Sequence, residues 1–317
     1  MKVQADITTF FTDKGNQFYV EGTSWPLWSL LDDLSISIVR LAVFSLEEQL
    51  YDYAEALKEI KAAGKKLYLD IHCSDYWADP SHQRIPITWD FKDINSLRSC
   101  FFKYICDICT LVYNSGVEVA YVQVGNEITN GMLWPYLNDL TECSRFLKIA
   151  ISYIRDSFPG SKIVVHTDLS GFPDKAVQWY QAINSKGVFY DIVGLSYYPV
   201  WHGTLETLKK TINRVHFSCQ KPVILCEIGY MSTTQKTKAW FGTWQCGSID
   251  YTPQGQSDYL EYLVAQLAGY KEYIIPEMYY WGGFSYVSKE HFPVALFDNN
   301  GNALPAIKTI KRINLNQ

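Results

Sequence analysis

Eight hydrophobic stretches of strand length recur along the chain and alternate with segments of helical periodicity. These stretches lack the strict apolar–polar alternation of a strand that has one solvated face. Continuous apolar strands that alternate with helices are typical of a parallel sheet buried on both faces. In chain order, the predicted strands are Val3–Ile7, Ser37–Val43, Lys66–Ile71, Ala120–Gly125, Lys162–Thr167, Asp191–Tyr198, Pro222–Gly229 and Pro276–Gly282.

The segments between the strands carry helix signals. Segment 45–64 starts with a serine followed by acidic residues and stops at a glycine, which predicts a helix over this range. In segment 252–270, Leu260, Leu263 and Leu267 fall on one helical face. Further helices are expected near 93–114, 136–157, 173–186, 204–217 and 303–313.

Eight strand–helix units fit an α/β fold of one kind, a single (β/α)8 TIM barrel that spans residues 1–317 as one catalytic domain. The rival is an open doubly wound sheet, which often carries a glycine-rich phosphate turn after its first strand. The first strand is followed by "TTFFTDKGNQ", which has no GxGxxG pattern. The barrel is therefore the prediction.

The charge and hydropathy of the chain exclude some classes of binding partner. The formal net charge of −5 argues against nucleic acid, because its binders usually present a basic face. No apolar run of about 18 residues exists, so no membrane-spanning helix is expected. The start "MKVQADITTFF" has no apolar leader, which leaves the location open between cytosolic and secreted after processing. We expect a monomer.

The eight cysteines form no zinc pattern. Cys106 and Cys109 make a CxxC pair, but it lies inside a predicted helix, and no second pair has matching spacing. Most of the cysteines are expected to be ordinary buried thiols, with disulfides left open.

Polar side chains gather at the carboxyl ends of the predicted strands, where the active site of a (β/α)8 barrel lies. Asp75 and Asp168 have an alternative role as helix caps, and His72 as a core histidine. Two buried carboxylates, Glu127 and Glu227, are costly unless paired. The full set is Arg40, His72, Asp75, Asn126, Glu127, Asp168, Tyr197, Tyr198, His202, Glu227 and Trp281.

Two carboxylates that face each other across a barrel mouth suit glycoside hydrolysis. One protonates the leaving oxygen, and the other attacks the anomeric carbon or activates water. Their separation decides between retention and inversion, and sequence spacing does not fix it. The same region has hard ligands for a metal, but no HxH or HExxH spacing occurs, so we predict no metal and no cofactor.

Aromatic residues support a sugar ligand. They make up 15 % of the chain, with 10 tryptophans. Aromatic rings have flat apolar faces, which suit stacking against sugar rings. Seven of the tryptophans follow predicted strands, namely Trp77, Trp89, Trp134, Trp201, Trp240, Trp244 and Trp281.

Five long motifs, found in order, resemble glycoside hydrolase family fifty-three, the endo-β-1,4-galactanases. They are Leu69–Trp89, Val122–Pro135, Asp191–Leu205, Lys221–Tyr230 and Ala295–Ile307. The likeness runs from Ala5 to the C-terminus. It implies a retaining enzyme that cleaves internal β-1,4-galactosidic bonds of galactan and type I arabinogalactan by double displacement.

The resemblance implies Glu127 as acid/base and Glu227 as nucleophile. Arg40 would keep Glu227 ionised, and a strand tyrosine, Tyr197 or Tyr198, would donate a hydrogen bond to it. The other substrate-binding residues implied are Asn126 at the sugar 2-hydroxyl, Trp281 as a platform under the sugar, and His72, Asp75, Trp77 and His202 at neighbouring hydroxyls.

Two alternatives stay open. A retaining barrel glycosidase could act on another β-linked polymer such as mannan, whose chain is straighter than galactan. A non-catalytic carbohydrate-binding barrel would use the same aromatic surface without the two acids.

Overall fold

The strands of the chain close into one barrel. A computed structural model describes residues 1–13, 16–45, 51–234, 249–286 and 293–316. All neighbouring barrel strands pair in parallel. The order around the barrel is β1 (Lys2–Asp6), β10 (Ile274–Tyr280), β9 (Val223–Ile228), β8 (Ile192–Tyr197), β7 (Lys162–Thr167), β6 (Val119–Val124), β5 (Lys66–Ile71) and β4 (Ile38–Val43).

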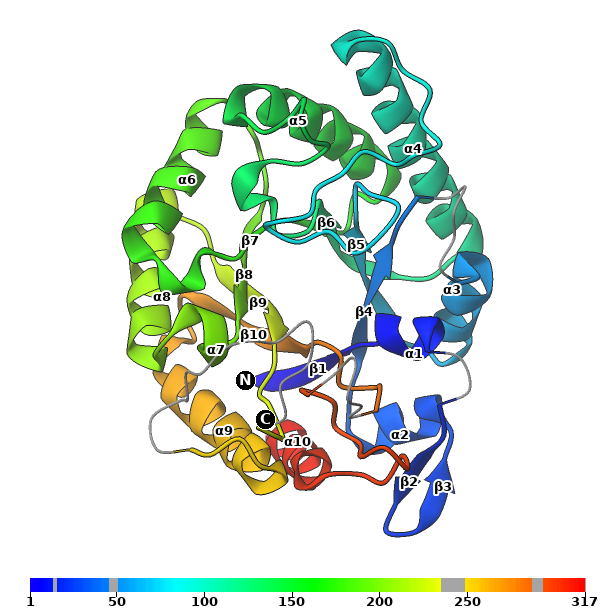
Figure 1. The fold of residues 1–317 in the computed structure, drawn as a ribbon, viewed down its shortest axis with the longest axis vertical. Coiled ribbons are helices and arrows are strands. Elements are labelled where there is room, and N and C mark those ends of the chain that lie inside the picture. Colours follow the sequence, from blue (N-terminus) through cyan, green and yellow to red (C-terminus); the bar gives the residue numbers. More distant parts are fainter. Residues whose placement is uncertain (14–15, 46–50, 235–248, 287–292, 317) are drawn as a thin grey trace.

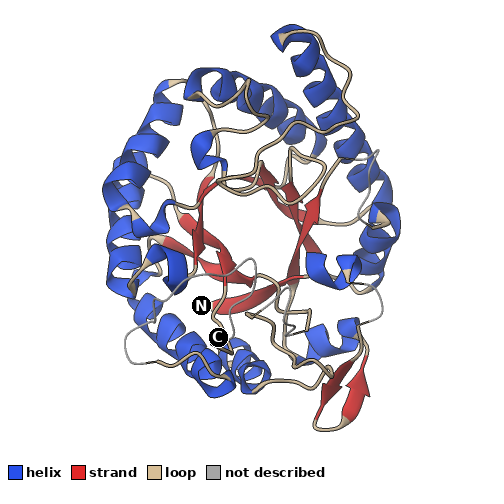
Figure 2. Ribbon diagram, viewed as in Figure 1, coloured by secondary structure: helices blue, strands red, loops and turns tan. Residues whose placement is uncertain are grey.

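The helices form an outer ring around the strands, as Figures 1 and 2 show. This arrangement confirms the predicted (β/α)8 fold. The α-helices are α1 (Thr8–Thr12), α2 (Leu27–Asp33), α3 (Tyr53–Ala62), α4 (Ile94–Ser115), α5 (Leu140–Ser157), α6 (Pro173–Ser185), α7 (Pro199–His202), α8 (Leu205–Cys219), α9 (Pro253–Leu267) and α10 (Pro305–Leu315). Short 3-10 helices cover Ile128–Asn130, Leu169–Gly171 and Ala268–Tyr270.

Helix α3 starts later than its sequence pattern predicts. It begins at Tyr53, because Asp52 caps it by accepting a hydrogen bond from the Glu55 N–H. The serine at position 45 is therefore not the cap. Residues 46–50, which belong to the predicted helix, lie outside the described residues, as do Trp240 and Trp244.

A two-stranded hairpin was not predicted. β2 (Phe18–Val20) and β3 (Thr23–Trp25) pair antiparallel and project beyond the ring of helices in Figure 1. The strands are too short for a period-2 pattern to stand out in sequence.

The apolar core has two parts. A small cluster fills the barrel interior, with Tyr68, Val164, Cys226 and Tyr279 fully buried within it. A much larger cluster joins the outer faces of the strands to the helices. Because these apolar side chains fill one layer of the barrel interior, the polar side chains of the next layer rest on a closely packed layer.

No helix in the described ranges combines the length and the apolar character that crossing a membrane requires. Seven of the cysteines fall in these ranges, and all seven are free thiols. Burial raises the pKa of the Cys143 thiol to about 12 and makes it unreactive. Cys246 lies outside the described residues.

Candidate active site

Arg40 is the centre of a buried charge cluster in the barrel. Its guanidinium is fully buried on β4. Nη1 lies 2.6 Å from Asp6 Oδ2, and Nη2 lies 2.8 Å from Asp70 Oδ2 and 3.0 Å from Glu227 Oε1. One cation thus serves three carboxylates from β1, β5 and β9. A buried charge is costly in free energy unless it is paired, and in this cluster every charge has an oppositely charged partner.

Asp6 and Asp70 are members of the cluster that the sequence analysis did not select. The signal that would have found them is the period of two along a strand, which puts alternate residues on one face. Tyr68, Asp70 and His72 alternate in this way along β5 and its end, and the first two face the barrel interior. Polar residues inside apolar strands therefore mark the inner layer of the site.

A β-bulge brings Glu227 into the same layer. Leu195 pairs with Leu225, but the next residue of β8, Ser196, pairs with Glu227. The extra residue is Cys226, whose thiol accepts a hydrogen bond from the Tyr68 hydroxyl in the interior. Strict alternation would send Cys226 and Glu227 to opposite faces, whereas the bulge lets both point inward.

Two hydrogen-bond donors hold the Glu227 carboxylate. Besides Arg40 at Oε1, the Tyr198 hydroxyl donates to Oε2 at 2.8 Å. The neighbouring Tyr197 donates instead to the Gly203 carbonyl at 3.0 Å. Burial raises the pKa of Glu227, while Arg40 opposes that rise.

Glu127 has a different environment. It follows β6 in a left-handed backbone conformation, with φ 47° and ψ 51°, which is uncommon for a residue with a side chain. The Gln83 amide supports this turn by donating to the Asn126 carbonyl at 2.7 Å. Burial, and then the negative charges of Glu227 and Asp168, raise the pKa of Glu127 well above its usual value. The pKa of Glu127 is therefore raised by like charges in addition to burial, whereas at Glu227 the Arg40 cation opposes the rise.

Asn126 precedes Glu127 in the chain and contacts Arg40, the cation that holds Glu227. Its Oδ1 lies 3.0 Å from Arg40 Nη2 and 2.9 Å from His166 Nδ1, and its Nδ2 donates to the Ala78 carbonyl at 2.8 Å. His166 was not selected from the sequence either, although it lies on β7 two residues before the selected Asp168.

The other selected polar residues lie in the same mouth with distinct partners. His72 uses both ring nitrogens on the protein: Ala78 N–H donates to Nδ1 at 3.1 Å, and Nε2 lies 2.9 Å from Asp70. Asp75 accepts from Arg84 Nε at 2.6 Å. His202 Nδ1 accepts from the Tyr198 backbone N–H at 2.9 Å, so a neutral ring carries its proton on Nε2.

Burial lowers the pKa of His202 to about 4, so that it is neutral near pH 7. Asp168 is half-buried and contacts the Thr129 hydroxyl. Its side chain makes no cap on the short helix that follows it, which removes the alternative role as a helix cap.

Aromatic rings lie at the same end of the barrel as the two acids, at the carboxyl ends of β4, β5 and β10. The Trp77 and Trp281 rings meet edge to face, with centroids 5.8 Å apart and planes at 83°. Phe44, the residue after β4, packs edge to face on Trp77 with ring centroids 5.1 Å apart. Both tryptophans are half-buried.

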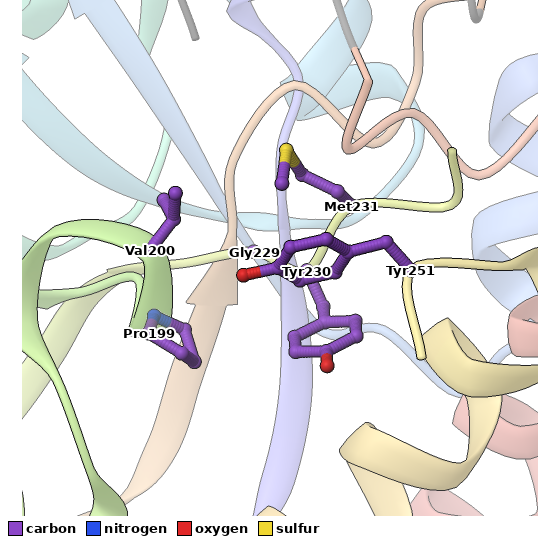
Figure 3. Close-up of a pocket in the computed structure, with 6 residues that line it drawn as sticks. All are labelled: Pro199, Val200, Gly229, Tyr230, Met231 and Tyr251. Carbon is purple, nitrogen blue, oxygen red and sulfur yellow. The ribbon is translucent and has the colours of Figure 1, made fainter. Parts of the chain in front are cut away.

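An apolar depression lies beside this site and has no catalytic groups. Figure 3 shows it between the start of α7, the turn after β9 and Tyr251 in the segment that leads into α9. Its lining contains no carboxylate, amine or imidazole. It is lined by Pro199, Val200, Gly229, Tyr230, Met231 and Tyr251. Among the described residues, no group of three His, Cys, Asp or Glu side chains is placed to hold a metal ion.

A closed (β/α)8 barrel with two buried carboxylates at the ends of β6 and β9 and tryptophans around them defines a glycosidase of the TIM-barrel class. The chain belongs to glycosyl hydrolase family 53, whose family model matches residues 10–310.

Relatives of the chain carry galactanase names. It is 30 % identical over 234 residues to a probable arabinogalactan endo-β-1,4-galactanase A of Aspergillus tubingensis, with 71 % of this chain and 66 % of that protein covered. It is 27 % identical to the arabinogalactan endo-β-1,4-galactanase of Humicola insolens, over 93 % of each. A solved structure of fungal β-1,4-galactanases superposes with a TM-score of 0.83 at 25 % identity, over 98 % of this chain and 99 % of that one. The chain thus spans slightly under two thirds of the first of these relatives.

Proposed function

We propose that the protein is an endo-acting, retaining β-1,4-galactanase that cleaves internal bonds of galactan and type I arabinogalactan. The observation that carries the proposal is the unequal pair of buried acids. Glu227 is held by Arg40 and Tyr198, which favour its charged form, whereas Glu127 lies between negative neighbours, which favour its protonated form. A nucleophile and a general acid need this difference. The galactanase relatives support the choice of substrate.

The two acids perform a double displacement. In the first step Glu227 attacks the anomeric carbon while Glu127 gives its proton to the leaving glycosidic oxygen, so that the C–O bond breaks as the galactosyl–enzyme ester forms. In the second step Glu127, now ionised, takes a proton from water as that water attacks the same carbon. The ester bond breaks, Glu227 leaves as a carboxylate, and the sugar keeps its β configuration.

The surrounding residues bind the sugar. Asn126 contacts the 2-hydroxyl at the cleaved unit, a contact that strengthens in the transition state. Trp281 and Trp77 form the stacking surface, and His202 and Asp75 offer a donor and an acceptor to hydroxyls. Both ring nitrogens of His72 already contact protein atoms. We therefore assign His72 the role of holding Asp70, and not that of binding a sugar hydroxyl.

The test of this function is hydrolysis of linear β-1,4-galactan followed by NMR. We expect oligosaccharides of mixed length, released from internal bonds, with the β anomer of the new reducing end appearing first. Linear β-1,4-mannan is the control polymer and should be cleaved far more slowly. Products of α configuration would overturn retention, and cleavage of mannan alone would overturn the substrate.

The Asp168→Asn variant should move the alkaline limb of the pH–rate profile to lower pH. The negative charge of Asp168 raises the pKa of Glu127, so removing that charge lowers this pKa. The acid must be protonated to work, so a lower pKa means that activity is lost at lower pH as the solution becomes more alkaline. The expected shift is on the order of one pH unit.

The control for that variant is Asp156→Asn, which removes the same charge from an exposed position near the end of α5. This position precedes β7, at the opposite end of the barrel from the site. Profiles of kcat/KM against pH for both variants check the prediction. An unchanged alkaline limb in Asp168→Asn would show that this charge does not set the pKa of the acid.

A further inference from the structure

The amide of Asn126 has one orientation. Three donors converge on its Oδ1: Arg40 Nη2 at 3.0 Å, Gln123 Nε2 at 3.1 Å and His166 Nδ1 at 2.9 Å. Arginine has no acceptor, so the atom that faces it must be the amide oxygen. The Nδ2 atom faces the Ala78 carbonyl, which is an acceptor, and so agrees with this orientation.

The hydrogen-bond pattern also fixes the tautomer of His166. Its Nδ1 faces the Asn126 oxygen, an acceptor, so Nδ1 carries a proton. A neutral imidazole has a single N–H, which makes Nε2 an acceptor for the Ser196 hydroxyl at 2.8 Å. His166 is fully buried on β7.

Burial and the neighbouring Arg40 cation keep this ring neutral. Burial lowers the pKa of His166 well below its usual value, and the Arg40 guanidinium lowers it further. The other titratable groups that act on it are Asp70, which works in the opposite direction, and His72 and His202. The arrangement of one donor on Nδ1 and one acceptor on Nε2 therefore persists across the neutral pH range.

Little of the Asn126 amide is then left for a ligand. Three donors fill Oδ1, and one of the two Nδ2 hydrogens is on the Ala78 carbonyl. A single N–H hydrogen remains. Asn126 can donate to a sugar hydroxyl oxygen and cannot accept from one, provided that its amide stays fixed.

We infer that His166 is the positioning residue for Asn126: anchored by the Ser196 hydroxyl on Nε2, it holds the amide from Nδ1 so that its one remaining N–H reads the 2-hydroxyl of the cleaved sugar. This inference rests on the proposed function and deepens it. His166 touches no reacting atom. It acts across 40 residues of sequence, from β7 to the turn after β6.

Two substitutions of His166 separate its two contacts. In His166→Asn the amide nitrogen can stand near the place of Nδ1 and still donate to Asn126. In His166→Gln the longer side chain reaches toward Ser196 near the place of Nε2 and leaves Asn126 Oδ1 without this donor. Both variants are neutral and polar, so they are matched for burial of a polar group.

The readout is the preference of the enzyme for an aryl β-galactobioside over its counterpart with a 2-deoxy sugar at the cleaved position, as a ratio of kcat/KM. We expect His166→Gln to lower this preference about tenfold, the scale of one hydrogen bond, and His166→Asn to stay within about threefold of wild type. In an Asn126→Ala background, His166→Gln should have no further effect on the ratio.

Thermal unfolding of each variant serves as the control for folding. Equal loss of kcat/KM on both substrates in His166→Gln would reduce His166 to a structural role and overturn the inference. A further fall of the ratio in the Asn126→Ala background would show that His166 does not act through Asn126. If wild type cleaves neither galactobioside nor galactan, the proposed function itself fails, which is a different result.

Discussion

The Glu227→Ala variant is expected to lose about four to six orders of magnitude in kcat on galactan, because it lacks the carboxylate that forms the ester with the anomeric carbon. The carboxylate that is removed is the one held by Arg40 and Tyr198. The residual rate reflects binding and the acid alone. The loss is measured as kcat on linear galactan at the optimum of the wild-type enzyme.

Azide provides a direct test of the nucleophile. In Glu227→Ala the missing side chain leaves room for azide, which attacks an activated aryl β-galactoside from the same face and yields an α-galactosyl azide. The matched control is Glu227→Gln, which also lacks the nucleophile but fills the space, and azide should not rescue it. A β-configured azide product from the alanine variant, or rescue of both variants alike, would contradict the role of Glu227.

The Arg40→Met variant is expected to lose about 3–5 kcal/mol in free energy of unfolding near pH 7, because it leaves three buried carboxylates without their cation. The affected groups are Asp6, Asp70 and Glu227. In the native protein, Arg40 and His72 hold the pKa of Asp70 below its usual value although burial works to raise it. Without Arg40 the pKa values of all three carboxyl groups rise.

The pH dependence of that loss has a definite sign. With raised pKa values, the folded variant binds more protons than the unfolded chain above about pH 4, so its stability falls as the pH rises. Thermal unfolding at pH 5 and pH 7.5 should therefore show a larger deficit at pH 7.5. Arg145→Met removes a surface cation from an exposed pair and should change stability by no more than about 0.5 kcal/mol at either pH. A deficit independent of pH would contradict the charge argument.

The strands could be predicted because burial on both faces leaves a continuous apolar run, and Lys66–Ile71 and Lys162–Thr167 match to the residue. The start of α3 could not, because Ser45 and Asp52 are equally good caps in sequence and only packing chooses between them. Helix ends depend on the chain around them, whereas a buried strand carries its own signal.

The site residues also fall into a group that the sequence predicts and a group that it does not. Glu127 and Glu227 stand at strand ends, where chemistry is expected, and so could be selected from the sequence. Asp6 and Asp70 lie within strands and were read as part of an apolar run. The sequence could not decide between Tyr197 and Tyr198. The hydroxyl that contacts Glu227 is set by the register between β8 and the bulged β9.

The Arg40 cluster has a consequence for how the chain becomes an enzyme. Its carboxylates come from positions 6, 70 and 227, and the last lies on β9, which meets β1 only across β10. Contacts so distant along the chain form late, because long loops must close first. A growing chain that lacks its final third holds the cation and two of its partners but not Glu227. Catalytic competence thus arises only once the barrel has closed, and nascent intermediates carry none of it.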